Sequence, residues 1–292
     1  MQENSRNTIF IEDGEILQRQ AFDEEQFILR VYAPKCARDA LPGQFVHIQC
    51  DPQRLMRRPL SIMRVSLVEG WVELLYKAVG DGTALLAKRK VGESVNLMGP
   101  IGRPFELNKK RPKALLLGGG VGIPPMICLA ELIKNQKSGI EATVFMGSEV
   151  PFPFKREKSA LPVLGVSNEV SSSLALLEQW RVPSRLASLQ GYSGVYQGYI
   201  TDLARDWLRA LNEDEKQQVA IYSCGPTPML KAVALLAKQF GIPCQVSLEE
   251  YMACAVGGCA GCVVKVITQT GEAMKRVCVD GPVFDAQTVF TE

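Results

Sequence analysis

Three cysteines fall within nine residues of this chain and a fourth follows downstream, and this spacing constrains the fold more than any other feature of the sequence. The segment reads Cys254-Ala-Val-Gly-Gly-Cys259-Ala-Gly-Cys262, and Cys278 is the fourth cysteine. A C-x4-C-x2-C run with a distant cysteine is the plant-type ligand arrangement of a 2Fe-2S cluster. The small residues between the ligands let the backbone curl closely around a cluster. Residues 249–292 are therefore predicted to form a small C-terminal 2Fe-2S domain.

Four cysteines can also bind structural zinc, and the chain would then be a non-redox regulatory module without a flavin. Zinc sites usually use two pairs of neighbouring cysteines, and three ligands in one tight loop fit that pattern poorly. The spacing therefore favours the cluster. The remaining thiols without ligand spacing, to which no role is assigned, are Cys36, Cys50, Cys128 and Cys244.

Short β-rich runs separated by turns fill residues 1–110. Runs at 27–32, 45–48 and 72–76 alternate with turn signals such as Pro42-Gly43 and Gly80-Asp81-Gly82. This pattern predicts an antiparallel β-barrel or sandwich.

The pattern changes at Lys113, where two strand-turn-helix-strand units begin. The first has an apolar strand at 114–117, a helix at 126–135 and a strand at 142–146; the second has a strand at 220–222, a helix at 229–240 and a strand at 244–248. Such units predict a parallel-sheet α/β domain over 111–248. Residues 151–198, rich in Pro, Ser and Gly, are expected to be an insertion and long connection with a short helix near 175–180.

Charge and hydropathy exclude several function classes. Lys plus Arg total 33 against 31 Asp plus Glu, and a net charge of +2 gives no broad attraction for nucleic acid. No apolar run approaches the ~20 residues of a membrane-spanning helix. The start of the chain has no secretory signal pattern and the cysteines are clustered, so a cytoplasmic location is expected. The single histidine, His47, lies in a strand-like segment, so no catalytic side chain is expected and the chemistry is assigned to cofactors.

The pentapeptide Arg57-Arg58-Pro59-Leu60-Ser61 is a candidate flavin-binding motif. Arg58 could pair with a pyrophosphate and Ser61 could reach a flavin ring. Alone, such a string is more often a solvated basic turn. Its neighbours strengthen the flavin interpretation, because Gly82-Thr83 leads into a predicted helix and can form an anion site.

Two glycine-containing turns are candidate nucleotide-binding motifs. The string GGGVGIPP at 118–125, which includes Gly120 and Gly122, joins strand to helix in a phosphate-cradling geometry. It departs from the Rossmann spacing, because Ile123 stands where a small residue is needed. The second turn, CGPTP, follows the next parallel strand and provides Cys224, Gly225 and Pro226. Cys224 could face a nicotinamide or be a buried packing residue.

The choice of nicotinamide rests on the segment after the strand at 142–146. Glu149 could accept a ribose hydroxyl, whereas Lys155 and Arg156 could favour a 2′-phosphate. NAD is expected, with NADP as the alternative.

Taken in order, RRPLS, GDGT, GPIGRPF, GGGVGIPPM, CGPTPML and CAVGGCAGC with CVDGPVF resemble the ferredoxin reductase-like family over nearly the whole chain. Within that family the likeness is greatest to the group of dihydroorotate dehydrogenase B electron-transfer subunits. The resemblance implies a FAD-binding barrel, an NAD(P)-binding α/β domain and a 2Fe-2S domain. It also implies that electrons pass between NAD, FAD, the cluster and a partner flavin. The partner would be a catalytic, FMN-containing dihydroorotate dehydrogenase-like subunit, in a heterotetramer that serves pyrimidine biosynthesis.

Similar subunits also serve NADH-dependent ferredoxin:NADP oxidoreductases and sulfur-metabolising oxidoreductases, which is the alternative assignment. The family motif places FAD contacts on Arg58, Pro59, Leu60, Ser61, Leu75, Tyr76, Lys77, Gly82 and Thr83, and cluster ligands on Cys254, Cys259, Cys262 and Cys278. The chain departs from the family at Ala255, where glycine commonly follows the first ligand, and in the long segment 151–198.

Overall fold

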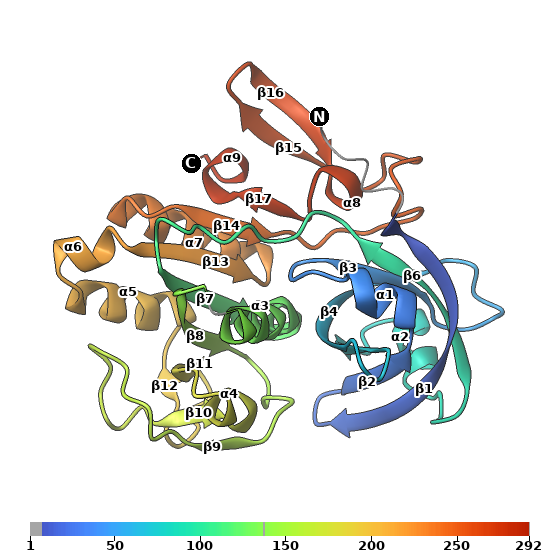
Figure 1. Ribbon diagram of the computed structural model, residues 1–292, viewed down its shortest axis with the longest axis horizontal. Coiled ribbons are helices and arrows are strands. Elements are labelled where there is room, and N and C mark those ends of the chain that lie inside the picture. Colours follow the sequence, from blue (N-terminus) through green and yellow to red (C-terminus); the bar gives the residue numbers. More distant parts are fainter. Residues whose placement is uncertain (1–7, 137, 292) are drawn as a thin grey trace. The chain divides into compact units, whose positions relative to one another are not determined.

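The structure, a computed structural model, describes residues 8–136 and 138–291, which divide into two compact units (Figure 1). Unit 1 contains the chain up to Phe105 together with Leu248–Val283. Unit 2 contains Glu106–Ser247 together with the residues from Phe284 onward. The sequence predicted three domains, at 1–110, 111–248 and 249–292. The structure instead groups residues 248–283, here called the cysteine-bearing segment, with the first unit and the end of the chain with the second. The three-part division therefore stays a prediction.

A closed barrel of six antiparallel strands forms the body of unit 1, in the order β1-β2-β5-β4-β3-β6. The strands are β1 (Phe10–Phe22), β2 (Gln26–Tyr32), β3 (Phe45–Gln49), β4 (Arg58–Ser66), β5 (Trp71–Lys77) and β6 (Ser94–Ile101). Two short helices, α1 (Pro34–Asp39) and α2 (Asp81–Leu86), connect them. Because β1 pairs with both β2 and β6, the sheet closes without a free edge. The predicted antiparallel barrel is confirmed.

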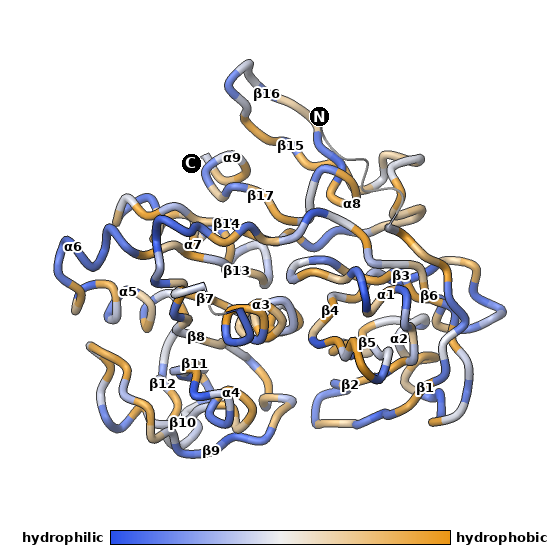
Figure 2. The backbone as a smooth tube through the Cα atoms, viewed as in Figure 1, coloured by the Kyte–Doolittle hydropathy of each residue, from blue (hydrophilic) through white to orange (hydrophobic). Residues whose placement is uncertain are grey.

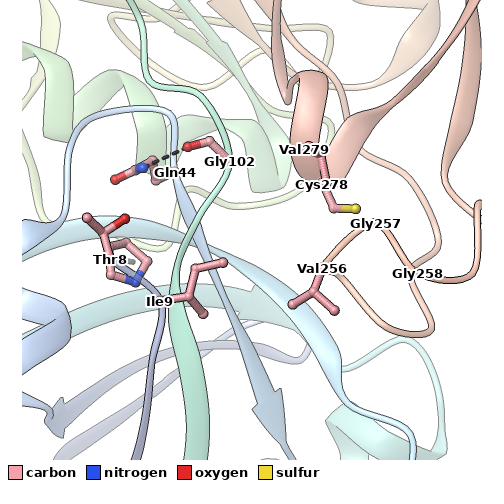
Figure 3. Close-up of a pocket in the computed structure, with 10 residues that line it drawn as sticks. Thr8, Ile9, Gln44, Gly102, Val256, Gly257, Gly258, Cys278 and Val279 are labelled. Carbon is pink, nitrogen blue, oxygen red and sulfur yellow. Dashed lines mark hydrogen bonds between the residues drawn. The ribbon is translucent and has the colours of Figure 1, made fainter. Parts of the chain in front are cut away.

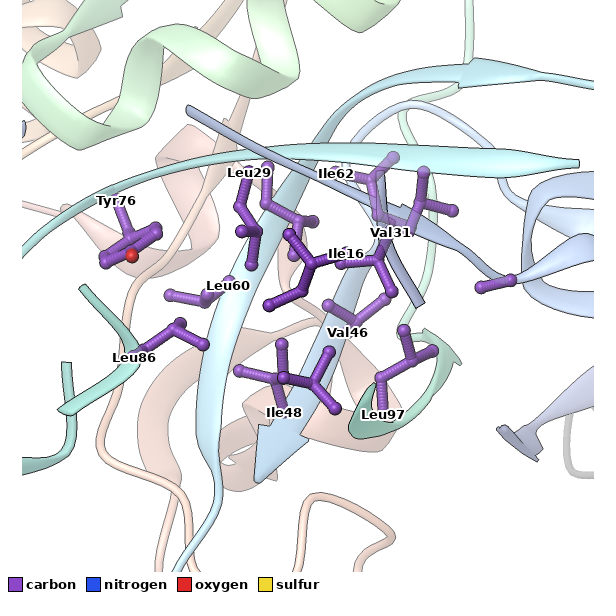
Figure 4. Packing of buried hydrophobic residues seen from close by; sticks show 14 of the residues in the cluster. Ile16, Leu29, Val31, Val46, Ile48, Leu60, Ile62, Tyr76, Leu86 and Leu97 are labelled. Atoms are coloured by element: carbon purple, nitrogen blue, oxygen red, sulfur yellow. The ribbon is translucent and has the colours of Figure 1, made fainter. Parts of the chain in front are cut away.

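Alternate side chains of these strands point inward and form one apolar core (Figure 4). On β2, Leu29 and Val31 are fully buried, whereas Arg30 between them pairs with Glu73 on β5 at 2.6 Å. This alternation follows from the two-residue period of a strand. All members of the core lie between residues 16 and 97, so the barrel core contains no residue of the cysteine-bearing segment.

Unit 2 is built on a seven-stranded sheet in the order β12-β11-β8-β7-β13-β14-β17. Its central strands are β7 (Lys113–Gly119), β8 (Glu141–Gly147), β13 (Val219–Cys224) and β14 (Cys244–Ser247), and β7 runs parallel to both β8 and β13. The helices are α3 (Ile123–Asn135), α5 (Ile200–Ala210), α6 (Glu213–Lys216) and α7 (Thr227–Phe240), and the short turn η2 (Gly120–Gly122) precedes α3.

The apolar run of β7 and the apolar helix α3 reflect their central position in unit 2 (Figure 2). A parallel strand is covered on both faces, so its sequence is hydrophobic throughout and does not alternate. The predicted parallel sheet is confirmed. Among the described helices, none is long and apolar enough to cross a membrane.

Residues 151–198 are more than the insertion and long connection that the sequence predicted. They form β9 (Arg156–Lys158), β10 (Ser172–Leu174), α4 (Ala175–Gln179), β11 (Ser184–Ser188) and β12 (Tyr196–Gln197). β11 pairs with β8, and β12 pairs with β11, so this segment supplies two strands of the main sheet. The short helix expected near 175–180 is confirmed.

The sequence did not predict the strand β11, because its buried residues include polar side chains that form hydrogen bonds inside the fold. The Ser184 hydroxyl lies 2.7 Å from that of Ser173, and Arg185 donates to the carbonyls of Ser184 at 2.7 Å and Leu161 at 2.8 Å. Paired polar groups can be buried at low cost, so the strand needs no hydrophobic run.

The cysteine-bearing segment forms a hairpin of β15 (Val263–Thr268) and β16 (Gly271–Arg276), followed by α8 (Val277–Asp280). It joins the barrel through the Arg103 N–H, which donates to the Gly281 carbonyl at 2.6 Å. The chain then passes into unit 2 after the first residue of β17 (Val283–Asp285) and continues to α9 (Ala286–Val289). There the Gln287 side chain donates to the Ala234 carbonyl at 3.0 Å. An isolated two-stranded hairpin is marginally stable, which explains why this segment packs on the barrel.

Candidate functional site

Arg58 and Gly82, which the sequence assigned to one flavin site, lie in contact at the start of β4 and the first turn of α2. A Cβ atom added to Gly82 would lie 3.1 Å from Nε and 3.2 Å from Cζ of Arg58. Glycine therefore leaves the space that the guanidinium occupies against the helix. We refer to this contact as the Arg58–Gly82 corner.

The adjacent residues Arg57 and Arg58 have different surroundings. Arg57, which directly precedes β4, donates to the carbonyls of His47 on β3 at 3.3 Å and Asn96 on β6 at 3.1 Å. Arg58 donates to the carbonyls of Met56 and Arg57, both at 3.1 Å. In the part of the chain that the structure describes, no carboxylate pairs with Arg58. Its charge is therefore free to bind an anion such as a pyrophosphate.

Tyr76 offers a second test of whether the barrel fits a flavin. Leu60 and Tyr76 belong to the barrel core, so Ser61, which follows Leu60, faces the outer surface. The Tyr76 ring stacks on Phe27 with centroids 5.5 Å apart, and burial raises the pKa of the Tyr76 hydroxyl. Within residues 8–136 and 138–291 this buried Oη has no hydrogen-bond partner. An unsatisfied buried hydroxyl is costly, so the site fits a bound group that would complete it.

The remaining residues predicted to bind FAD lie on the same strands and helix. Pro59 is on β4, Leu75 is buried on β5, and Lys77 ends β5. The Thr83 hydroxyl donates to the Gly80 carbonyl at 3.1 Å and accepts from the Gly80 N–H at 3.3 Å. Thr83 therefore stabilises the first turn of α2, and a direct contact of these four residues with FAD stays a prediction.

The cysteine loop, residues 254–262, turns through left-handed backbone at three positions. These are Ala255 with φ of 56°, Gly257 with 81° and Ala260 with 53°. The alanine at 255, noted as a departure from the family, thus occupies a conformation that favours glycine and costs an L-residue roughly 1–2 kcal/mol. The turns direct main-chain N–H groups at sulfur: Cys259 N–H donates to Cys254 Sγ and Gly261 N–H to Cys259 Sγ, both at 3.4 Å.

The four predicted ligands form two pairs. Cys262 and Cys278 are buried with their sulfur atoms 3.4 Å apart, and burial raises the pKa of Cys278 to about 12. Cys254 accepts hydrogen bonds from the main chain and side chain of Cys259. Burial is the largest single influence and acts to raise the pKa of Cys254, yet hydrogen bonds from the main chain of Val256 first, and from Cys259 and Gly258, together lower it to about 7.

Two pairs of thiols suit a binuclear cluster, in which each iron takes two cysteines. Among the described residues, no three cysteine, histidine or acidic side chains gather in a ready-made site for one metal ion. The N–H groups aimed at the sulfurs fit an anionic iron-sulfur centre, because such hydrogen bonds stabilise thiolates and tune the cluster. The donor set therefore fits a 2Fe-2S cluster.

A hollow of about 380 Å³ lies between the barrel and the cysteine loop within unit 1 (Figure 3). The barrel contributes Gln44 and Gly102 to its wall, and the cysteine-bearing segment contributes Val256, Gly258 and Cys278. One of the four predicted cluster ligands thus lines a cavity shared with the barrel.

In unit 2 the two predicted nucleotide motifs lie in contact. A Cβ atom on Gly122 would lie 2.4 Å from the carbonyl carbon of Cys224 and 2.4 Å from the Gly225 nitrogen. Gly120 has φ of 54° and no atom within 4 Å of a Cβ position, so its backbone faces open space. Both motifs sit at the carboxyl ends of neighbouring parallel strands, the edge at which open α/β sheets bind ligands. Cys224 is fully buried, and Pro226 directly precedes α7.

The residues that could select the nicotinamide lie near the same sheet. Glu149 follows β8, and its carbonyl accepts a hydrogen bond from Gln190 at 3.2 Å. Gln190 belongs to the loop after β11, which the sequence analysis missed because it did not place β11 in the sheet. Arg156 lies over the Tyr192 ring at 5.3 Å, and Lys155 precedes it directly.

Comparisons with known proteins extend over most of the chain. Residues 249–290 match the family model described as the iron-sulfur cluster binding domain of dihydroorotate dehydrogenase B. Residues 17–105 match the oxidoreductase FAD-binding domain. The dihydroorotate dehydrogenase B (NAD(+)) electron transfer subunit of Desulforamulus reducens is 32% identical over 284 residues, covering 96% of this chain and 98% of the relative. The subunit of the same name from Listeria innocua is 35% identical over 264 residues, covering 89% and 91%.

Solved structures of other reductases share this fold. The structure of an NADH-dependent reduced ferredoxin-NADP oxidoreductase is similar with a TM-score of 0.75 and 28% identity, covering 95% of this chain and 90% of that chain. A ferredoxin reductase of carbazole 1,9a-dioxygenase, with a TM-score of 0.62 and 20% identity over 80% of this chain, shares the fold.

Proposed function

The chain belongs to the family of dihydroorotate dehydrogenase B electron-transfer subunits, and we propose how its own residues carry out that function. It is an oxidoreductase subunit that uses FAD, an iron-sulfur cluster and NAD, and it passes electrons between a partner flavoprotein and NAD. The alternatives drawn from the sequence, a subunit of a ferredoxin:NADP or sulfur-metabolising oxidoreductase and a zinc-bearing regulatory module, are not supported by these relatives.

The observation that most directly supports this assignment of residues is that the Arg58–Gly82 corner and the cysteine loop belong to the same compact unit, unit 1. When bound, FAD exchanges a hydride with nicotinamide and single electrons with an iron-sulfur cluster. The protein then needs to position and insulate these groups, and no side-chain base is required. A chain whose single histidine is buried in the barrel fits that requirement.

For FAD we propose that Arg58 binds the pyrophosphate and Ser61 reaches the flavin ring. Gly82 keeps the guanidinium in place, and the buried Tyr76 hydroxyl gains a partner from the bound group. Pro59, Leu60, Leu75, Lys77 and Thr83 shape the same surface.

For the 2Fe-2S cluster we propose Cys254 and Cys259 as ligands of one iron and Cys262 and Cys278 as ligands of the other. The main-chain N–H groups of the cysteine loop stabilise the negative charge on the sulfurs.

For the nicotinamide nucleotide we propose that Gly120 and Gly122 cradle the phosphates and that Cys224, Gly225 and Pro226 line the nicotinamide end. Glu149 is proposed to accept a ribose hydroxyl, which favours NAD over NADP.

The relatives are named as subunits, which implies a catalytic companion chain. We propose that this companion is an FMN-containing dihydroorotate dehydrogenase-like subunit, that the two form a heterotetramer, and that the complex works in the cytoplasm in pyrimidine biosynthesis. Anaerobic co-purification of the tagged chain from its native cell, followed by mass spectrometry, tests this partner. Recovery of a different flavoprotein in stoichiometric amount would overturn it.

Replacing Cys259 with Ala tests the division of labour within the chain. The variant should lose iron but keep FAD, because the barrel core contains no residue of the cysteine-bearing segment. In the reconstituted complex, stopped-flow absorbance should show NADH reducing the FAD while transfer to the partner flavin collapses. Cys128→Ala, a thiol in α3 without ligand spacing, is the matched control and should retain about two irons per chain. Transfer at the wild-type rate by a Cys259→Ala complex would show that the cluster is not the obligatory path.

A further inference from the structure

Arg276 lies at the junction between the cysteine loop and the helix that carries the fourth cysteine. It ends β16 and directly precedes α8, whose second residue is Cys278. Its main-chain N–H donates to the Asp280 carboxylate at 2.8 Å, which closes the short helix around Cys278. The next N–H, of Val277, donates to the Cys262 carbonyl at 2.9 Å. The backbone at Arg276 is therefore fixed next to two of the four proposed ligands.

The Arg276 side chain reaches across to the loop that carries the other ligands. Its Nη1 donates to the Gly257 carbonyl at 3.0 Å. Gly257 has φ of 81°, and a Cβ there would lie 2.6 Å from Val279 Cγ2 and 3.2 Å from Arg276 Nη1. The guanidinium thus packs directly against the backbone between Cys254 and Cys259.

The charge of this guanidinium is only partly compensated. Arg276 Nε lies 3.6 Å from the Asp280 carboxylate, beyond normal hydrogen-bond distance, and the Arg276 side chain is 36% exposed. Lys275, the preceding residue on β16, points to the opposite face of the hairpin because side chains alternate along a strand. Of the two adjacent cations, Arg276 is therefore the one that contacts the cysteine loop.

We propose that Arg276 is a positioning residue that also raises the reduction potential of the cluster. The inference rests on the proposed cluster ligands. With four thiolates and two sulfides, uptake of one electron changes the net charge of a 2Fe-2S cluster from −2 to −3, and no bond forms or breaks. A nearby cation stabilises the more negative state and so favours reduction. Arg276 holds the loop through Gly257 and supplies that charge at the same place.

The test is an EPR-monitored redox titration of the anaerobically purified complex, with iron content measured on the same samples. Arg276→Met keeps the length of the side chain and removes the charge, so the ratio of reduced to oxidised cluster at a fixed potential should fall about three- to tenfold. For a one-electron couple this is a potential lower by about 30–59 mV. Arg276→Lys keeps the charge and should recover most of the shift. Lys275→Met removes the same charge from the opposite face and should leave the potential at the wild-type value.

If Arg276→Met does not retain iron, Asp280→Asn provides a second test of the role of Arg276. The amide keeps an oxygen acceptor for the Arg276 N–H but removes the compensating negative charge, so the ratio of reduced to oxidised cluster should rise. An unchanged potential in the Asp280→Asn variant, or in an iron-replete Arg276→Met variant, would overturn the role of Arg276. An equal shift in Lys275→Met would overturn it as well. A wild-type protein without a 2Fe-2S EPR signal would instead refute the cluster assignment on which the inference rests.

Discussion

Replacing Arg58 with Ala is the most direct test of the Arg58–Gly82 corner. The guanidinium has no carboxylate partner among the described residues and donates to two main-chain carbonyls at 3.1 Å, so its removal leaves no buried charge unpaired. Stability should therefore change by less than about 1 kcal/mol. Loss of a charge-assisted contact to a phosphate costs roughly 1.5–3 kcal/mol. The Kd for FAD should thus rise about 10- to 150-fold.

Gly82→Ala perturbs the same corner from the helix side. The new Cβ would lie 3.1 Å from Arg58 Nε, so the guanidinium must move by a few tenths of an ångström. Alanine is better than glycine inside a helix by up to about 1 kcal/mol, so α2 should be no less stable. FAD affinity should fall several-fold without loss of Tm. In the Arg58→Ala background there is no guanidinium to displace, and Gly82→Ala should have no additional effect on affinity.

Both variants can be measured by titrating FAD into deflavinated protein and following flavin fluorescence, with thermal unfolding of the same samples. Arg57→Ala is the matched control, because Arg57 bonds to the carbonyls of His47 and Asn96. It should lower the Tm and leave the Kd for FAD unchanged at temperatures where the barrel is folded. Wild-type affinity in Arg58→Ala, or an equal loss of affinity in folded Arg57→Ala, would refute the assignment of Arg58 to the pyrophosphate.

Three further predictions concern single residues. Gly122→Ala would place a Cβ 2.4 Å from the backbone of Cys224, and backbone atoms cannot move aside as a flexible side chain can. Thermal unfolding should therefore show a free energy of unfolding lower by at least about 1–3 kcal/mol, together with weaker NAD binding. A wild-type Tm would contradict this. Ala255→Gly relieves a φ of 56°, worth roughly 1–2 kcal/mol, but it removes a buried methyl group worth about 0.8 kcal/mol and adds a glycine entropy cost of about 0.5–1 kcal/mol. Stability should therefore stay within about 1 kcal/mol of the wild-type value with unchanged iron content, and loss of iron would show that the methyl group is needed. Burial lowers the pKa of His47 to about 4 from 6.5, so the unfolded chain binds more protons and stability falls as the pH drops from about 6.5 through 4. The free energy of unfolding should fall by about 3 kcal/mol over this pH range because of His47. The fall should be smaller in His47→Leu, and an equal fall in the two proteins would refute the burial argument.

The sequence predicted the barrel and the parallel sheet because their hydrophobic patterns are local. Short β-rich runs between turn signals mark β2 and β5, and the continuous apolar run marks β7. It did not predict β11, because the Ser184 hydroxyl and the Arg185 Nη2 of this strand bond to partners elsewhere in the same unit. A buried polar strand has no signature in a hydropathy pattern when its partners are distant in sequence.

The candidate site shows the same division between local and long-range information. The sequence predicted that Arg58 and Gly82 belong together, and the structure places them in contact. It predicted Cys278 as the fourth ligand from its position downstream of the three spaced cysteines, and the structure places its sulfur 3.4 Å from that of Cys262. It had no means of recognising Arg276, because the importance of this residue depends on a contact with Gly257 that only the folded loop creates.

The placement of the cysteine-bearing segment makes the two proposed cofactor sites of unit 1 depend on each other unequally. The barrel core is complete between residues 16 and 97, so folding of the proposed FAD surface needs no contact from residues 248–283. The cysteine-bearing segment is a two-stranded hairpin with a four-residue helix, and much of its surface is exposed. Such an element is marginal alone, so its ordered state depends on contacts such as that between Arg103 and Gly281. Destabilising the barrel should therefore remove both sites, whereas disrupting the cysteine loop removes only the iron-sulfur site.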